Sequence, residues 1–480
     1  MAAVTGANKS ACSDELWELL LKNQFHDILP GTSLTCVNEL ARKEVAGIIN
    51  DANAETARLA DSILTDDNYI TVFNSASFDR SDIVYLDTPI GQPFTDVMGR
   101  ERYAADLGTI PALGAKSVEV RDLPADLSLK FDFDEDLRTV RTRHVTAKFD
   151  ENGFIESLVD HASGREVRRE GADPLNKFII CEDVPQNYDD WDIDADIAFK
   201  KPGKVELLSR KVVSCGAFEL RIRSEYAIGR ESKLTQDMVF NAKSPRIDFH
   251  TKIDWKDKHS LLKVSFDVDI MSATAKHEIQ FGHVDRPTTR NTSIEAAQFE
   301  VCNHKWTDIS ESRFGVALLN DCKYGISVEG SDMRLSLHRG GCRPDVTGDE
   351  GVHEVTYSLL PHTGAFGAEN VVRPAYLLNY PVIVRPGKLA SPVEPLIRIG
   401  ESNIIAEAVK PAEDIENAYV VRLYECERCR TACEIALASD VKEAWVVNML
   451  EEEKYRLDIV DGKVKLDIAP FKIVTLMLKK

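Results

Sequence analysis

Cysteine is scarce in this sequence, which has 10 cysteines in 480 residues. That density lies far below the density of disulfide-stabilised scaffolds, so a reducing, cytoplasmic location is the expectation. The N-terminal residues lack the basic and apolar regions of a secretory signal. No apolar stretch approaches the roughly 18 residues that suggest a membrane-spanning helix. We therefore expect neither export nor membrane insertion.

Basic residues are also fewer than acidic residues. Lys plus Arg number 59 and Asp plus Glu number 79, which gives a formal net charge of −20. Nucleic acids and anionic bilayers are bound through local excesses of Lys and Arg, so neither is an expected partner. The sequence also has no glycine-rich phosphate loop, no Gly-x-Ser-x-Gly elbow and no His-Glu-x-x-His. Its chemistry must therefore lie in a less common motif.

Two helices are predicted near the N-terminus. Ser13 is a plausible N-cap, and apolar residues follow at helical spacing until Pro30-Gly31 ends the first helix. Thr32 and Ser33 can cap a second helix, which we expect to continue to about Leu64. Its single apolar stripe must pack against the first helix or against another surface.

The remaining chain reads as β-structure. From Tyr69 the apolar period changes from 3.6 to 2, and Asp150–Gly153 is typical of a hairpin turn. Many strands without helical patterns between them predict a mainly β protein of antiparallel sandwiches. A further boundary is expected near Arg385–Lys388. The predicted division is a helical segment at 1–66, a small β domain at 67–135, a large sandwich at 136–386 and a C-terminal sandwich at 387–480.

The segment Asn23–Thr32, with the sequence NQFHDILPGT, contains the most unusual candidate residues. His26 and Asp27 are adjacent polar residues between an apolar helix end and a tight turn, where side chains can project into a neighbouring cleft. On spacing alone, a histidine here is more often a packed or dipole-complementing residue than a metal ligand.

This segment resembles the middle-domain motif of the α-mannosidases of glycoside hydrolase family 38, in which a His-Asp pair followed by Ile-x-Gly-Thr/Ser closes the active site. The resemblance is closest to the cytosolic and bacterial branch of the family. It implies that the two helices are the remnant of a three-helix middle domain, followed by galactose-mutarotase-like sandwiches. It continues through residues 72–80, 150–158, 182–193, 280–292, 304–306, 316–325 and 335–339.

The resemblance implies a zinc site and a mannose-binding site. His26 falls on a zinc-ligand histidine of the family, and Asp27 falls on the neighbouring carboxylate that bonds sugar hydroxyls. Asp190, Trp191 and Asp192 could present an aromatic face and carboxylates to a sugar. The alternative for that run is a solvated acidic turn with Trp191 packed beneath it.

A second stretch resembles the part of the large β domain that reaches back to the active site. It contains Arg339, Asp345 and Asp349, for which an ordinary surface ion pair is the competing interpretation. His338 departs from the family pattern, in which an apolar residue is usual, and this suggests a repacked strand or a surface-facing side chain.

Cys426, Cys429 and Cys433 form a C-x-x-C-x-x-x-C run. Such a run could bind zinc or an iron–sulfur cluster, but a fourth ligand at partner spacing is missing. Packing or solvent exposure is therefore the favoured interpretation of these cysteines.

The function implied by the resemblance is that of the C-terminal portion of a retaining, zinc-dependent α-mannosidase acting on mannose-containing oligosaccharides. In this family the nucleophile, the acid/base and the other zinc ligands lie on an N-terminal domain that is missing here. His26 alone should not hold zinc tightly, because a catalytic site needs at least three protein ligands. We therefore expect a chain that is inactive alone and that needs an N-terminal half as its partner, with a homo-oligomer as a further expectation.

A second hypothesis is a stand-alone β-sandwich protein that binds carbohydrate or a protein partner without catalysis. Met1 opens the sequence about a dozen residues before the first predicted helix, which is compatible with a gene that begins here.

Overall fold

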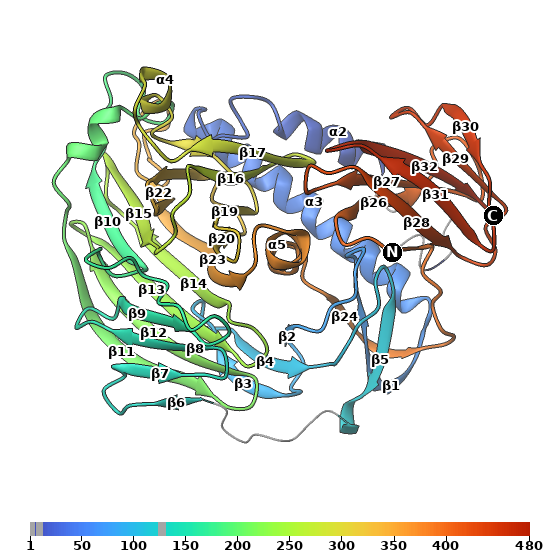
Figure 1. Ribbon diagram of the computed structural model, residues 1–480, viewed down its shortest axis with the longest axis horizontal. Coiled ribbons are helices and arrows are strands. Elements are labelled where there is room, and N and C mark those ends of the chain that lie inside the picture. Colours follow the sequence, from blue (N-terminus) through green and yellow to red (C-terminus); the bar gives the residue numbers. More distant parts are fainter. Residues whose placement is uncertain (1–4, 6–12, 123–130) are drawn as a thin grey trace.

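The structure is a computed structural model that describes residue 5, residues 13–122 and residues 131–480. Two helices, α2 (Asp14–Asn23) and α3 (Thr35–Asp61), come first, and strands make up most of the remaining chain (Figure 1). The prediction of a mainly β protein with a short N-terminal helical segment is confirmed. Among the residues described, no helix has both the length and the apolar character needed to cross a membrane.

The two helices are held together by Glu44 of α3. Its carboxylate lies 2.6 Å from Lys22 Nζ and accepts a hydrogen bond of 2.9 Å from Asn23 Nδ2. Both donors belong to the last turn of α2, so the C-terminal end of that helix is fixed against α3. Helix α3 ends three residues before Leu64, which the sequence placed at the end of this helix and which instead begins strand β1 (Leu64–Phe73).

The large sandwich consists of a nine-stranded and a five-stranded antiparallel sheet with a four-stranded sheet beside them. The nine-stranded sheet has the order β11 (Val205–Cys215), β12 (Glu219–Ile228), β13 (Ser232–Asn241), β14 (Ile247–Trp255), β23 (Gly351–Thr363), β20 (Phe314–Asn320), β19 (Trp306–Ser310), β16 (Thr274–Ile279) and β17 (Gly282–Pro287). The five-stranded sheet has the order β10 (Lys177–Glu182), β15 (Ser260–Asp267), β22 (Asp332–Arg339), β21 (Gly325–Glu329) and β18 (Val301–Cys302). The four-stranded sheet is β6 (Asp132–Phe133), β7 (Thr139–Arg141), β8 (Val145–Phe149) and β9 (Ile155–Asp160).

Aromatic residues from the two larger sheets meet in the core. The ring of Phe249 on β14 lies 5.0 Å from Tyr357 on β23 and 5.8 Å from Phe266 on β15. All three side chains are buried, and alternate residues along their strands point inward, as a two-sheet sandwich requires. The predicted hairpin at Asp150–Gly153 is present as the connection between β8 and β9.

Smaller sheets complete the fold, and those of the C-terminal part lie across α3 from the large sandwich (Figure 1). The sheet β24 (Ile383–Leu389), β1 and β5 (Ala115–Glu119) lies beside a second sheet of β2 (Ile83–Leu86), β4 (Glu101–Asp106) and β3 (Gln92–Thr95). The C-terminal part has a sheet of β25 (Ile397–Ile399), β28 (Thr431–Leu437) and β31 (Lys463–Ile468). Its other sheet is β26 (Ile404–Pro411), β27 (Ala418–Glu425), β32 (Ile473–Lys479), β29 (Glu443–Val447) and β30 (Glu453–Leu457).

The segment Arg385–Lys388, where the sequence suggested a boundary, is part of strand β24. Arg385 pairs with Thr71 and Pro386 pairs with Ile70 of β1. A proline is tolerated here because β24 is the edge strand of its sheet.

In the ranges that the structure describes, five short helical segments interrupt the β-structure, and the sequence interpretation missed them. Val371, Val372, Ala375 and Tyr376 are buried at helical spacing in the core between the large sandwich and the C-terminal sheets. This spacing was the signal that could have revealed the helical turns at residues 368–379. The segments are η1 (Val120–Asp122), η2 (Ala195–Phe199), α4 (Ser293–Ala296), the π-helical turn η3 (Ala368–Val372) and α5 (Arg373–Asn379).

His338 is buried at the end of β22, with only 6% of the residue exposed. Its ring lies 4.7 Å from Trp255 and 4.2 Å from His353. Burial lowers the pKa of His338 to about 2, and the neighbouring His353 and Lys323 add to the effect. The surface-facing alternative for this residue is therefore wrong, because the imidazole packs inside the protein at the end of β22.

We predict that His338→Leu makes the protein less sensitive to acid. Between a pH of about 6.5 and about 2, the unfolded chain binds a proton at this position and the folded chain does not. The free energy of unfolding therefore falls as the pH drops below 6.5, by up to about 1.4 kcal/mol per pH unit. Melting temperatures measured from pH 7 to pH 5 should fall less steeply in the variant.

The matched control for this prediction is His161→Leu, which changes an exposed histidine of the same sandwich. An unchanged pH dependence in His338→Leu would contradict the assignment of a buried, neutral imidazole.

Candidate functional site

The turn after α2 carries His26 and Asp27 on the surface. His26 Nε2 lies 3.3 Å from Asp27 Oδ2, and the two side chains are 71% and 36% exposed. The ring of Phe25 lies 4.3 Å from the His26 ring. Gly31 ends the turn with a φ of 78°, a left-handed conformation that favours glycine. The His-Asp pair is thus presented outward rather than packed into the protein.

Hydrogen bonds from the next residues fix this turn. Ser33 Oγ donates to the backbone oxygen of Asp27 at 2.7 Å, and Thr32 Oγ1 lies 3.5 Å from Asp27 Oδ1. The prediction that Thr32 and Ser33 cap α3 is therefore wrong. Leu34 occupies the N-cap position, and the two hydroxyls hold Asp27 instead.

Asp345 joins the start of α3 to the large sandwich. Its carboxylate accepts hydrogen bonds from Thr35 Oγ1 at 2.6 Å, from Asn38 Nδ2 at 2.9 Å and from Thr347 Oγ1 at 2.7 Å. Burial acts to raise the pKa of Asp345, but these hydrogen bonds outweigh it and hold the pKa well below its usual range. The Asn38 amide also lies 3.4 Å from the backbone oxygen of Gly31. Asp345 is thereby connected to the turn that carries His26.

Asp190 lies against the same loop. Its Oδ2 accepts a hydrogen bond of 2.8 Å from the backbone N–H of Asp345, and its own N–H donates to the oxygen of Arg343 at 2.9 Å. A Cβ on Gly341 would lie 1.9 Å from Asp190 Oδ1, so only glycine allows this approach. Burial raises the pKa of Asp190, and the nearby carboxylates of Asp189 and Asp349 add to the rise. The Asp190 carboxylate therefore holds the loop between β10 and β11 against the loop between β22 and β23.

Trp191 and Asp192 follow on an exposed turn. Trp191 is 62% exposed, so the alternative in which its ring packs beneath the turn is wrong. The backbone oxygen of Asp192 accepts a hydrogen bond from Arg339, whose guanidinium also pairs with the buried Asp183. Arg339 thus holds the acidic turn in place through Asp183 and Asp192, rather than by pairing with Asp345 or Asp349.

Asp349 lies further along the same connection between β22 and β23. It has a φ of 54°, and its backbone oxygen contacts His353 Nε2 at 2.7 Å. Its carboxylate is exposed. The structure therefore brings the His26 turn, Asp345 and Asp190 into one connected network, and it places Asp349 at the edge of that network.

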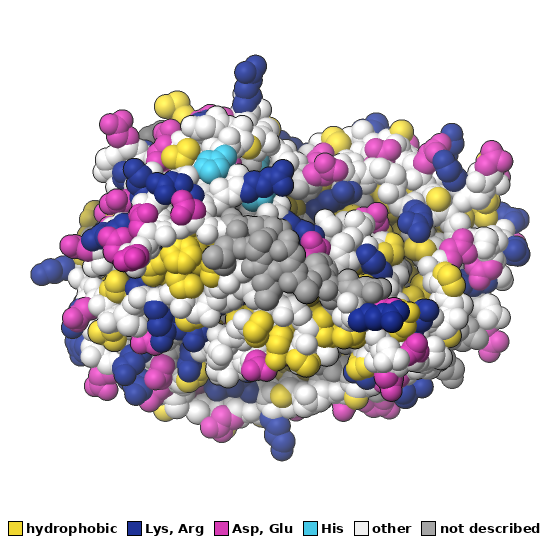
Figure 2. Space-filling model, turned by 90° about the horizontal axis from the view of Figure 1, so that it is seen from below, with side chains coloured by type: hydrophobic (Ala, Val, Ile, Leu, Met, Phe, Trp, Pro, Cys, Tyr) yellow, Lys and Arg dark blue, Asp and Glu magenta, His cyan; other side chains and the backbone are white. Residues whose placement is uncertain are grey.

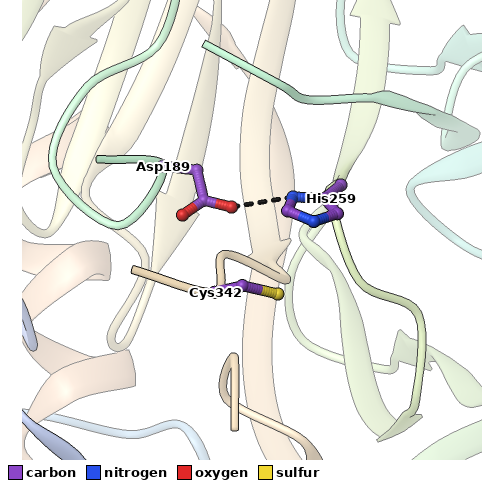
Figure 3. Close-up of side chains that lie close together, drawn as sticks. All are labelled: Asp189, His259 and Cys342. Atoms are coloured by element: carbon purple, nitrogen blue, oxygen red, sulfur yellow. Dashed lines mark ion pairs between the residues drawn. The ribbon is translucent and has the colours of Figure 1, made fainter. Parts of the chain in front are cut away.

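A zinc ion is not accommodated by His26 and this chain alone. In the part of the chain that the structure describes, one group of three His, Cys or carboxylate ligands lies close enough to share an ion. That group is Asp189, His259 and Cys342 (Figure 3). His26 is not a member, so these residues do not supply the three ligands that a zinc site at His26 needs.

The C-x-x-C-x-x-x-C run does not form a ligand cluster of this kind either. Cys426 and Cys433 are buried, and Cys429 is exposed. Cys429 Sγ lies near Glu425 Oε1 and Thr431 Oγ1, at 3.5 and 3.4 Å. The three sulfur atoms thus take separate packing and surface roles.

Two cavities lie away from the His26 turn. A cavity of about 740 Å³ is lined by Trp17 of α2 and by residues such as Tyr380 and Arg422. A second, of about 550 Å³, is lined by Glu278, Tyr376 and neighbouring polar residues. His26 and Asp27 line neither of these two cavities.

Acidic and basic side chains are interspersed on the face shown in Figure 2. This mixed distribution contrasts with the concentrated basic surfaces on which nucleic-acid binding depends.

Three family models match the sequence. They are the alpha mannosidase middle domain at residues 3–63, the glycosyl hydrolases family 38 C-terminal domain at 140–347 and the family 38 C-terminal beta sandwich domain at 403–476. The chain belongs to glycosyl hydrolase family 38. It corresponds to the middle and C-terminal domains of the family, as the resemblance of its motifs indicated.

Curated members of the family support this assignment. Alpha-mannosidase 2C1 of Homo sapiens is 34% identical over 478 residues, an alignment that covers 96% of this chain and 45% of the human protein. The alpha-mannosidase of Saccharomyces cerevisiae is 29% identical over 498 residues, which cover 97% of this chain and 43% of the yeast protein. The chain therefore spans about half the length of the curated relatives that it matches.

Solved structures show the same fold. The crystal structure of an alpha-mannosidase from Enterococcus faecalis V583 matches with a TM-score of 0.78 at 14% identity, covering 97% of this chain and 63% of that one. A family 38 protein from Enterococcus faecalis matches with a TM-score of 0.75 at 15% identity, covering 97% of this chain and 66% of its own.

We predict that Asp345→Asn loosens the start of α3. The new amide would place a donor against the Asn38 amide, and the hydrogen bond between them would be lost. The expected local destabilisation is about 2 kcal/mol, which corresponds to roughly 30-fold faster amide exchange near Thr35 and Asn38. Hydrogen exchange followed by mass spectrometry measures this directly.

Asp349→Asn is the matched control, because it makes the same chemical change on the same connection at an exposed carboxylate. Asparagine also tolerates the left-handed backbone at this position. Equal exchange in the two variants would contradict the anchoring role of Asp345.

Proposed function

We propose that this chain is the C-terminal portion of a retaining, zinc-dependent α-mannosidase that removes α-linked mannose from oligosaccharides. The observation that carries the proposal is the exposed His26–Asp27 pair, which lies on a surface turn and is tied to the sandwich through Asp345. In this proposal His26 contributes one zinc ligand and Asp27 hydrogen-bonds sugar hydroxyls.

The chain alone is proposed to be inactive. Retaining glycosidases use two carboxylates about 5–5.5 Å apart, one as nucleophile and one as acid/base. We assign both, together with the other zinc ligands, to an N-terminal half that this chain does not contain. The length of the curated relatives, about twice that of this chain, supports the assignment.

The helical pair supplies the surface on which we propose that the N-terminal half docks. Large apolar side chains that monomers usually bury are at least half exposed along α2, the turn and α3. They are Trp17, Leu21, Phe25, Leu29, Leu34, Leu40 and Ile49, with exposed fractions from 50% to 72%.

The other candidate residues divide by their contacts. Trp191, Asp192 and Asp349 expose side chains near the network and are proposed to contact the oligosaccharide. Asp190, Asp345 and Arg339 are engaged within the protein, so we propose that they position the loops that carry those contacts.

A cytoplasmic location completes the proposal. The nine cysteines in the described ranges are all free, as expected in a reducing compartment.

We predict that activity appears only when the missing half is supplied. Incubated alone with a chromogenic α-mannoside and zinc, the chain should be inactive. Mixed with the remaining half of human alpha-mannosidase 2C1, it should restore hydrolysis. His26→Ala should reduce this restored activity at least about 100-fold, because loss of a ligand should exceed the 10- to 100-fold effect of losing an outer-shell partner.

His161→Ala, which removes an exposed histidine of the sandwich, is the control and should retain the restored activity. The human protein's own two halves, expressed separately and then mixed, serve as the positive control for complementation. Turnover by this chain alone would refute the division of the active site. Carbohydrate binding without any restored hydrolysis would favour the stand-alone binding protein.

We also predict that the chain self-associates through the exposed helical face, which gives the expected homo-oligomer or larger aggregates. Leu21→Glu combined with Leu29→Glu should lower the mean mass measured by light scattering at high concentration. Leu450→Glu is the control, since Leu450 is 79% exposed on the C-terminal part. A wild-type chain that stays monomeric would count against an uncovered docking face.

A further inference from the structure

Three loops of the large sandwich bring together a carboxylate, an imidazole and a thiol. Asp189 lies between β10 and β11, His259 between β14 and β15, and Cys342 between β22 and β23. Their potential ligand atoms lie within 4.8 Å of one another. In Figure 3 the Asp189 carboxylate points at the His259 ring, and Cys342 directs its sulfur toward the side of the ring.

The Asp189 carboxylate is buried without the hydrogen bonds that such a group needs. Only 6% of the residue is exposed, and neither carboxylate oxygen accepts a hydrogen bond from the residues described. The His259 ring lies against it, with Nδ1 at 2.8 Å from Asp189 Oδ2. A buried carboxylate with so few partners is costly unless a cation neutralises it.

The backbone holds the three loops in register before any ion binds. The N–H of His259 donates to the oxygen of Gly340 at 2.6 Å, and its oxygen accepts from the N–H of Asp183 at 2.8 Å. A Cβ on Gly340 would lie 2.2 Å from the backbone oxygen of Asp257, so the close approach depends on glycine. The ligands are therefore preorganised by the fold rather than by surface side chains.

We propose that Asp189, His259 and Cys342 form a binding site for a zinc ion, separate from the position of His26. Thiolate, imidazole and carboxylate together suit zinc, whereas magnesium and calcium prefer oxygen ligands alone. Zinc–ligand distances of 2.0–2.3 Å place ligand atoms roughly 3.3–3.8 Å apart, so only small side-chain movements complete the site. His259 is 50% exposed, which leaves a path for the ion and a fourth position for water.

The ion would act as a clamp on the loops that anchor the helical pair. Asp190, the next residue after Asp189, accepts the N–H of Asp345, and Asp345 holds the start of α3. Zinc binding therefore stabilises the connection through which the His26 turn is positioned.

Cobalt titration of the metal-stripped full chain tests this site. The wild type should bind a single Co²⁺ per chain with the intense near-ultraviolet band of a thiolate-to-cobalt transition. Cys342→Ser should abolish that band, and His259→Asn should weaken binding while keeping a residue that tolerates the left-handed backbone at this position. Circular dichroism verifies that each variant is folded, and His259→Asn decides the outcome if Cys342→Ser does not fold.

Cys429→Ser and His161→Ala, which change an exposed cysteine and an exposed histidine outside the proposed site, are the controls, and both should bind cobalt as the wild type does. A band that persists in Cys342→Ser, or that disappears in Cys429→Ser, would assign the thiolate elsewhere and overturn the proposal. The absence of a thiolate band in the wild type would also overturn it. A second readout is amide exchange at residues 343–347, which zinc should slow in the wild type and leave unchanged in Cys342→Ser.

Discussion

The arrangement of this protein depends on a buried carboxylate that must be paired. Asp345 sits on a loop of the large sandwich and is satisfied by donors from the start of α3, chiefly Thr35 and Asn38. Because an unsatisfied buried charge costs several kcal/mol, the loop and the helix are ordered together. These hydrogen bonds fix the start of α3, and the ion pair between Asp61 and Arg385 of β24 fixes its other end, so the two together orient the helical pair and its His26–Asp27 turn.

The neighbouring acidic residues Asp183, Asp189 and Asp190 also have carboxylates that need a partner, and each has a different one. Asp183 pairs with Arg339, Asp190 accepts a backbone N–H, and Asp189 lies against the imidazole of His259. Their concentration on adjoining loops makes the anchor sensitive to any cation that binds there. The anchor of the helical pair and the proposed zinc site are thus parts of one electrostatic arrangement.

The large sandwich and the helical pair differ in how completely they bury their apolar side chains. The sandwich encloses a core of aromatic and aliphatic side chains, whereas the helical pair leaves residues such as Leu21 and Leu29 exposed. This chain buries a large core yet leaves one apolar face exposed, and such a face is typical of a surface that another polypeptide covers. The exposed His-Asp turn lies on that same face, which links the proposed docking surface to the proposed chemistry.

Local sequence patterns determined the two helices, the hairpin after Phe149 and the His26–Asp27 motif, because each depends on periodicity or on neighbouring residues. The buried face shared by η3 and α5 was also readable from the spacing of Val371, Ala375 and Tyr376, although it was missed within a β-rich region. Contacts between distant loops could not be read in this way: Thr35 meets Asp345 across 310 positions, and Asp189, His259 and Cys342 share no motif. The sequence by itself determined the class of fold and the family, since these follow from local periodicity and contiguous motifs. Only the tertiary structure decided which carboxylates are hydrogen-bonded within the protein and which are exposed, because their partners depend on how the loops of separate strands pack.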